Sequence, residues 1–125
     1  MEKLVTEANE DSPYIFFDGD LGIIEIKGKS LPEDAILCYT PLYELVQEYI
    51  KNPKQSTTIN FSLEYLNSSS AKKILEIITL LENLPSQGFQ VEIKWFYNAN
   101  DEDMFEEGEE FTRMTDLPIL LIQEQ

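Results

Sequence analysis

A change of apolar period in the middle of the chain constrains the fold more than any other feature. From Thr57 to Tyr65 apolar and polar residues alternate, which is the period of a half-buried strand. From Ala71 to Leu84 apolar residues recur every three or four positions, which is the period of an amphipathic helix. The turn from Asn67 to Ser70 separates the two segments. The sequence therefore predicts a strand, a polar turn and a helix that packs on a sheet.

The polar turn carries three hydroxyl groups at the predicted start of this helix. Asn and Ser are preferred there because a side-chain oxygen accepts a hydrogen bond from an unpaired backbone N–H. Capping is one interpretation, and phosphorylation is another, because the helix dipole favours a group that adds a charge of about −1.5 to −2. Lys72 and Lys73 have the wrong sign for the dipole. They suit a phosphate or an acidic partner, or are solvated residues of the polar face.

The remaining segments follow the same two periods. They predict a loose polar segment over residues 1–12, followed by a hairpin of strands 14–17 and 23–27 around Asp18 to Gly22. A short helical turn at Glu33 to Ala35 and a separate helix, capped by Thr40 with Pro41 at its first position, come next. The last predicted elements are a strand over residues 89–97, an acidic helix from Asp101, and a strand over residues 119–122, where Pro118 marks a strand start or an edge strand. This β-β-α-β-α-β-α-β order predicts a single α/β domain over residues 13–125. Its mixed sheet contains parallel pairs, and its helices pack on the sheet.

Composition excludes several function classes. The 125 residues include 42% hydrophobic residues, enough for one core. The net charge of −15, from 24 acidic and 9 basic residues, repels phosphate backbones and anionic membranes, so we expect no nucleic-acid partner. The acidic N-terminal segment has no apolar signal core and no run approaches ~20 apolar residues, so we expect no membrane insertion and a cytoplasmic protein.

The residues that most catalytic sites use are scarce. The chain has no histidine and one cysteine, Cys38, so an internal disulfide and a Cys-rich zinc site are excluded and no cofactor is expected. A small hydrolase would need a serine nucleophile, with Lys72 or Lys73 as its base, or the carboxylates of Asp101 and Asp103. Neither lysine lies in a clearly apolar setting that would lower its pKa. We therefore expect a protein that is not an enzyme.

The segment from Asp101 to Asp116 holds eight acidic residues and a single base, Arg113. Its apolar residues form a seam at helical spacing, and its first acids suit the helix dipole. A solvated acidic helix is the simplest interpretation. The alternatives are a docking surface for a basic partner and a magnesium site at Asp101 and Asp103.

Four separated motifs resemble those of a known family. They are Leu31 to Ala35, Tyr39 to Leu42, Phe61 to Ser70, and Asp101 to Met104 together with Gly108 to Phe111. From about Ser12 to Ile122 the chain resembles the SiaC family of bacterial regulatory phosphoproteins. The resemblance implies a fold like that of the STAS and anti-sigma-factor-antagonist domains.

The resemblance also implies signal transduction by partner switching. A cognate Ser/Thr kinase would phosphorylate the turn, and a PPM-type phosphatase would remove the phosphate. The unmodified form would bind a target such as a diguanylate cyclase and raise its activity, which links the switch to cyclic di-GMP and biofilm formation. The family's phosphoacceptor threonine falls on Ser68, and Ser69 is the alternative.

The expected partner surface combines the serine turn with the acidic motif. Its predicted residues are Asn67, Ser68, Ser69, Ser70, Lys72, Lys73, Asp101, Glu102, Asp103 and Met104. A constitutive protein-binding module or a self-associating scaffold is the alternative function.

Overall fold

The strands lie in the sheet in the order in which they occur along the chain. The computed structural model describes residues 3–124. The strands are β1 (Lys3–Thr6), β2 (Tyr14–Asp18), β3 (Ile23–Ser30), β4 (Ser56–Leu66), β5 (Gln90–Asn98) and β6 (Ile119–Glu124). Strands β1, β2 and β3 pair antiparallel, whereas β3, β4, β5 and β6 pair parallel. The predicted mixed sheet with parallel pairs is therefore confirmed.

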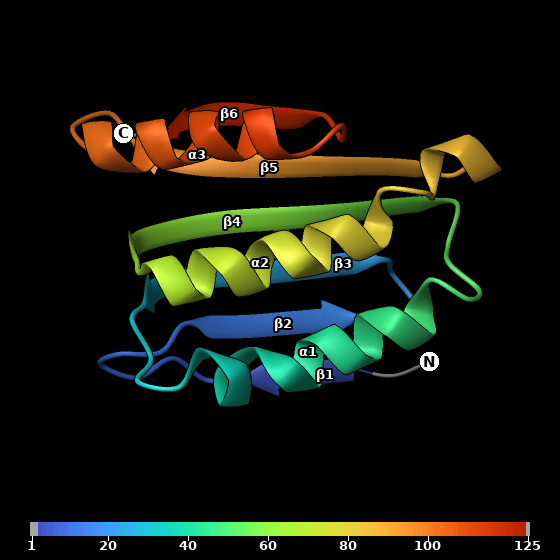
Figure 1. Cartoon of the computed structure of the whole chain (residues 1–125), viewed down its shortest axis with the longest axis horizontal. Helices are drawn as coiled ribbons and strands as arrows, with labels where there is room; N and C mark the ends of the chain where they lie inside the picture. The colour runs from blue at the N-terminus through green and yellow to red at the C-terminus, as the bar shows by residue number, and fades with distance from the viewer. Residues whose placement is uncertain (1–2, 125) are drawn as a thin grey trace.

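Three helices connect the parallel strands and lie on one face of the sheet (Figure 1). They are α1 (Ala35–Tyr49), α2 (Ser68–Leu81) and α3 (Glu102–Met114), and a short 3₁₀ turn (Pro85–Gln87) follows α2. Each crossover advances by one strand in the same direction, and such crossovers are almost always right-handed. All three helices must therefore cover the same face. The opposite face carries polar side chains, including a Glu25–Lys27 ion pair at 3.6 Å.

The core lies between this helical layer and the sheet. Strand residues at alternate positions point into it, which confirms the predicted half-buried strands. Its largest fully buried side chains include Trp95, Tyr39, Phe17, Phe61, Ile59, Leu42, Ile74 and Leu81. The Trp95 ring packs against the rings of Phe61 and Phe111, with centroids 5.1 and 5.2 Å away. Each buried side chain of this size contributes roughly 1.5–3 kcal/mol relative to an exposed one.

The structure adds a strand within the N-terminal segment that was predicted to be loose. Residues 3–6 form β1, which pairs with β2 from Lys3↔Asp18 to Thr6↔Ile15. The Lys3 ammonium lies 3.5 Å from the Asp18 carboxylate. Four residues are too few to display a clear alternation, so the sequence pattern did not reveal this edge strand.

The predicted break before the helix at Thr40 is wrong. One continuous helix, α1, begins at Ala35, and Pro41 lies inside it. A proline in a helix interior removes a hydrogen bond and costs about 3 kcal/mol. The buried stripe of Ala35, Tyr39, Leu42 and Val46 runs through this point, and burial of a ring the size of Tyr39 offsets a cost of that order.

Two local predictions are confirmed. Gly22, in the turn between β2 and β3, has a φ of +68°, which glycine adopts without strain. Pro118 directly precedes β6, which is an edge strand. None of the helices within residues 3–124 is long and apolar enough to cross a bilayer.

Candidate functional site

All three helices begin at one edge of the sheet, the edge where the parallel strands end (Figure 1). Each helix is capped by the side chain of the residue before it: Asp34 for α1, Asn67 for α2 and Asp101 for α3. Each cap oxygen accepts a hydrogen bond from the backbone N–H three residues later, at 2.9–3.0 Å. The fold thus gathers three positive helix ends at one edge, and in open α/β sheets binding sites favour this edge.

The three serines at the start of α2 have different environments. Ser68 and Ser69 are exposed, whereas Ser70 is fully buried. The Ser69 hydroxyl donates a hydrogen bond to Asn67 Oδ1 at 3.2 Å, and the same oxygen accepts from the Ser70 backbone N–H. Within residues 3–124 the Ser68 hydroxyl has no protein partner. Ser68 therefore carries the hydroxyl of this turn that is both exposed and without a hydrogen bond to the described residues.

The buried Ser70 belongs to a chain of three hydroxyls that sequence reasoning missed. Ser30 Oγ donates to Ser70 Oγ at 2.8 Å and lies 2.6 Å from the hydroxyl of Tyr39. Burial raises the pKa of the Tyr39 phenol well above its ordinary value, although its hydrogen bond with Ser30 acts in the opposite sense. Forty residues separate Ser30 from Ser70, so no local spacing in the sequence signalled this contact.

The two lysines of the first turns of α2 differ in their pairing. Lys73 Nζ lies 3.2 Å from Glu76 Oε1, in an ion pair three residues along the helix. Lys72 is exposed and forms no ion pair within the described residues. It lies four residues after Ser68, and side chains at that spacing are neighbours on a helix surface. Lys72 is thus the free cation closest along the helix to the Ser68 hydroxyl.

The acidic motif has a structural part and an exposed part. Asp101 caps α3, and Glu102 and Asp103 occupy its first turn. Met104 is buried, and its backbone carbonyl accepts a hydrogen bond from the indole N–H of Trp95 at 3.0 Å. The side chain of Met104, one of the predicted partner-binding residues, therefore faces the core.

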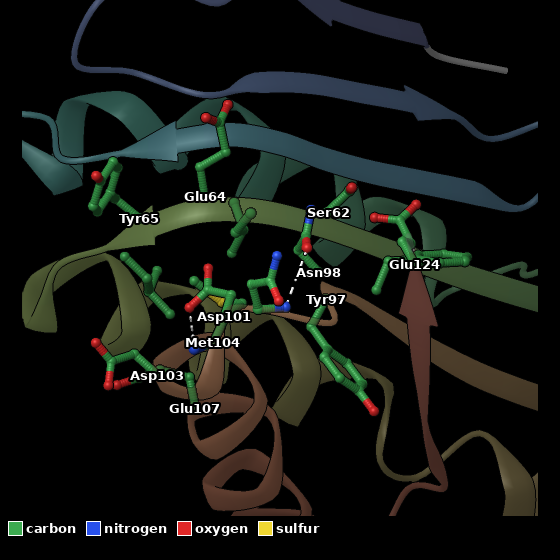
Figure 2. Close-up of a pocket in the computed structure, with 14 residues that line it drawn as sticks. Ser62, Glu64, Tyr65, Tyr97, Asn98, Asp101, Asp103, Met104, Glu107 and Glu124 are labelled. Carbon is green, nitrogen blue, oxygen red and sulfur yellow. Dashed lines mark hydrogen bonds between the residues drawn. The ribbon is translucent and has the colours of Figure 1, made fainter.

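A hollow of about 780 Å³ lies between the end of β4 and the start of α3 (Figure 2). We call it the acidic hollow, because its lining contains five carboxylates and no lysine or arginine. These carboxylates are Glu64, Asp101, Asp103, Glu107 and Glu124. Burial, and then the carboxylates of Glu110 and Asp103, raise the pKa of Glu107. The hollow also includes Tyr65 and Leu66, which immediately precede the serine turn, so the structure brings the two predicted motifs to one region.

Several apolar side chains near the starts of α1 and α2 are exposed, and they were not among the predicted site residues. Leu31, Ile36, Leu37 and Tyr65 are all exposed, and Leu37 is 74% exposed. The loop from Ser30 to Pro32 contacts the turn directly: the Asn67 backbone N–H donates to the Ser30 carbonyl at 3.0 Å, and its side-chain amide donates to the Pro32 carbonyl at 3.5 Å. Exposed apolar side chains that form a contiguous patch are typical of surfaces that bind partners.

The site does not assemble the groups that the hydrolase alternative requires. None of the turn serines, and no lysine, lines the acidic hollow. Asp101 is occupied as a helix cap, which gives no support to the magnesium site. Among residues 3–124, no three His, Cys, Asp or Glu side chains are grouped to hold a metal ion.

The chain matches the SiaC family of regulatory phosphoproteins over residues 6–124. It is 26% identical, over 97% of its length and 96% of the relative, to an uncharacterized protein of Pseudomonas aeruginosa strain UCBPP-PA14. The crystal structure of apo-SiaC from P. aeruginosa has a TM-score of 0.89 at 25% identity, covering 98% of this chain and 99% of that one. SiaC in complex with the diguanylate cyclase SiaD, which it activates, has a TM-score of 0.90 at 26% identity, covering 97% and 99%.

These matches extend over nearly all of the chain, and the TM-scores show that it shares the fold of the SiaC structures. The resemblance of this fold to the STAS domains stays a prediction. The family is one of regulatory phosphoproteins, so the chain is a regulatory protein rather than an enzyme. This chain belongs to the SiaC family of regulatory phosphoproteins.

Proposed function

We propose that this chain is a partner-switching regulator that is phosphorylated on Ser68 and binds its target when Ser68 is unmodified. One observation carries the choice of Ser68: it is the turn serine that is exposed and has no protein hydrogen bond, whereas Ser69 is bonded to Asn67 and Ser70 is buried. A kinase needs an accessible hydroxyl. Phosphorylation of Ser69 would first break its hydrogen bond to the cap.

The start of α2 is suited to a phosphate for two further reasons. Its first turn contains no acidic residue, so the positive end of the helix dipole is not compensated by the chain itself. Lys72, four residues after Ser68, is available to pair with a phosphoryl oxygen. The phosphorylated form is therefore stable as a folded protein, and the modification acts on docking rather than on folding.

The proposed target is a diguanylate cyclase that this chain activates, by analogy with the complex of SiaC and SiaD. A Ser/Thr kinase and a PPM-type phosphatase complete the proposed switch. The partner surface consists of the turn from Asn67 to Ser70, Lys72 and Lys73, and the start of α3 from Asp101 to Met104. Of these, Ser70 and Met104 act by positioning their neighbours, because their side chains are buried.

The exposed apolar side chains explain why a phosphate would oppose docking. A partner that covers Leu31 and Tyr65 also covers the serine turn, because Leu31 lies in the loop that is hydrogen-bonded to Asn67 and Tyr65 lies two residues before Asn67. Burying a charge without a matching partner typically costs on the order of 2–5 kcal/mol. This cost corresponds to a loss of affinity of roughly 30-fold to several thousand-fold.

The test is a binding titration of the purified cyclase with four forms of the chain. They are the unmodified parent, the phosphorylated parent isolated from its own cells, Ser68→Ala and Ser69→Ala. Mass spectrometry assigns the phosphate to a residue. We expect phosphate on Ser68, tight binding of the unmodified parent and of Ser69→Ala, and affinity at least 30-fold weaker for the phosphorylated form. Equal affinities of the unmodified and phosphorylated forms, or a phosphate confined to Ser69, would contradict the proposal.

A further inference from the structure

A buried chain of hydroxyls ties the first turn of α2 to two other elements. Ser30 is the last residue of β3, Tyr39 lies in α1, and Ser70 lies in the first turn of α2. Their relative exposures are 0%, 1% and 0%. The oxygen atoms are 2.6 Å apart between Tyr39 and Ser30, and 2.8 Å apart between Ser30 and Ser70. Three buried hydroxyl groups are thus paired with one another.

The direction of this chain follows from the number of hydrogens. A serine hydroxyl has one hydrogen, and Ser30 donates its hydrogen to Ser70. The hydrogen in the bond between Tyr39 and Ser30 must then come from Tyr39. Tyr39 is therefore the first donor and Ser70 the final acceptor. Removal of the Tyr39 hydroxyl removes the hydrogen bond that the Ser30 hydroxyl accepts.

The same part of α2 is also held through its backbone. The Asn67 N–H donates to the Ser30 carbonyl at 3.0 Å, and the Ala71 N–H donates to the Asn67 carbonyl at 3.0 Å. Ser30 therefore contacts the turn twice, through its carbonyl on Asn67 and through its hydroxyl on Ser70. Ser68 lies between these two points of attachment, and its own side chain makes no such contact.

We propose that Tyr39 and Ser30 are positioning residues for the phosphoacceptor turn, which they hold in one orientation by anchoring Ser70. The functional part of this inference rests on the proposed phosphorylation of Ser68. Ser70 is then the anchor of the turn and never its phosphoacceptor. The kinase and the target meet a turn that is already folded, with Ser68 presented outward.

The opposite end of α1 provides a matched control. Tyr49 is also a buried tyrosine of α1, and its hydroxyl lies 2.8 Å from Thr57 Oγ1 on β4. Tyr39→Phe and Tyr49→Phe each remove one buried hydroxyl from the same helix. The Tyr39 hydroxyl connects to the serine turn, whereas the Tyr49 hydroxyl connects to Thr57 and accepts a hydrogen bond from the Lys54 backbone N–H.

The first measurement is amide hydrogen exchange of the whole chain, at residues Ser70 and Ala71. We expect exchange at these amides to be at least tenfold faster in Tyr39→Phe than in Tyr49→Phe, which corresponds to about 1.4 kcal/mol of local opening. Ser70→Ala, which removes the final acceptor of the three hydroxyls, should have the same effect. This variant replaces Tyr39→Phe in the experiment if Tyr39→Phe does not fold. Exchange that is equally fast in all three variants, with similar melting temperatures, would overturn the proposal.

The second measurement is the rate at which the cognate kinase phosphorylates Ser68 in each variant. We expect a change of at least threefold for Tyr39→Phe and Ser70→Ala, and a rate for Tyr49→Phe equal to that of the parent. Equal rates in all variants would overturn the positioning role. A parent chain that never acquires phosphate would instead refute the proposed function, while the exchange measurement would still decide whether the anchor exists.

Discussion

The helices α2 and α3 begin at the same edge of the sheet, but they differ in the charges of their first turns. Both are capped by a side-chain oxygen, at 2.9 Å from the Ser70 amide and 3.0 Å from the Met104 amide. The first turn of α3 contains Glu102 and Asp103, whereas that of α2 contains no acid. Acids near a helix start contribute about 0.3–1 kcal/mol each. The start of α3 is already compensated, and the start of α2 can still gain from an added anion.

The two helix starts also differ in what holds them. Close packing of Gly108 against Trp95 holds α3, in addition to the Asp101 cap and the hydrogen bond from the Trp95 indole N–H to the Met104 carbonyl. Hydroxyl and amide hydrogen bonds hold the start of α2. A permanent acidic surface can rest on rigid packing. A reversible switch needs an accessible hydroxyl on a turn that polar contacts keep in register, and the following experiments test this difference.

The largest expected effect is that of Gly108→Ala in α3. An added Cβ would lie 2.6 Å from Trp95 Cδ1 and 2.7 Å from Leu121 Cδ2, so helix and sheet must separate. We expect a loss of stability of about 2–3 kcal/mol, despite the better helix propensity of alanine. Denaturant unfolding measures it, with the exposed Glu106→Ala as the control. A loss below about 0.5 kcal/mol would show that α3 is not held by close packing.

The two caps should differ in value. The Asn67 side chain accepts hydrogen bonds from the Ser70 N–H and the Ser69 hydroxyl, whereas within residues 3–124 the Asp101 side chain accepts one, from the Met104 N–H. We expect Asn67→Ala to cost about 1.5–2 kcal/mol and Asp101→Ala about 1 kcal/mol in denaturant unfolding. A larger loss of stability for Asp101→Ala than for Asn67→Ala would show that polar contacts hold the start of α3 more strongly than the start of α2.

A smaller effect tests the pairing of Lys72 with a phosphate on Ser68. Side-chain ion pairs at this spacing contribute about 0.2–0.5 kcal/mol. Removal of the cation in Lys72→Gln should therefore raise the phosphoserine pKa, ordinarily about 6, by about 0.1–0.4 units. Phosphorus NMR titration of the phosphorylated chain measures this shift. The control is Lys51→Gln, just after the C-terminal end of α1, where Lys51 Nζ lies 2.8 Å from Glu48 Oε2. This change should leave the phosphoserine pKa unchanged.

The smallest effect concerns Glu107 in the acidic hollow. Its pKa is raised in the folded state, chiefly by burial, so the folded chain binds its proton more tightly than the unfolded chain. Its contribution to stability is present below the ordinary pKa of 4.5 and is lost as the pH rises through the folded value. Glu107→Gln should therefore be slightly more stable than the parent at pH 7, because solvent screens a carboxylate that is only partly buried, and equal to the parent below pH 4. A variant less stable than the parent at pH 7 would contradict this prediction.

Much of the fold could be predicted because it depends on local periodicity. The alternation in β4 and β5 and the apolar spacing of α2 are visible in short windows of sequence. The start of α1 was mispredicted because Thr40 and Pro41 form a good local start signal. The burial of Tyr39 against the sheet, which no local pattern reveals, decided that the helix continues through them.

The candidate site was predictable only in part. The turn from Asn67 to Ser70 and the acidic motif from Asp101 are continuous in sequence and carry their own chemical signals. The sequence left Ser68 and Ser69 as alternatives, because both hydroxyls lie in the same capping pattern. Their different hydrogen bonding in the folded chain is what favours Ser68 in the proposed switch.

The sequence by itself determined the alternation of strands and helices, the serine-rich helix start and the strong negative charge, since each is a property of neighbouring residues or of composition. Tertiary structure alone decided that the helix starts share an edge, that Ser70 is buried, and that Tyr39 reaches it through Ser30. These features depend on contacts between residues far apart in the chain, which form only when the parallel strands align and the crossovers place all three helices on one face.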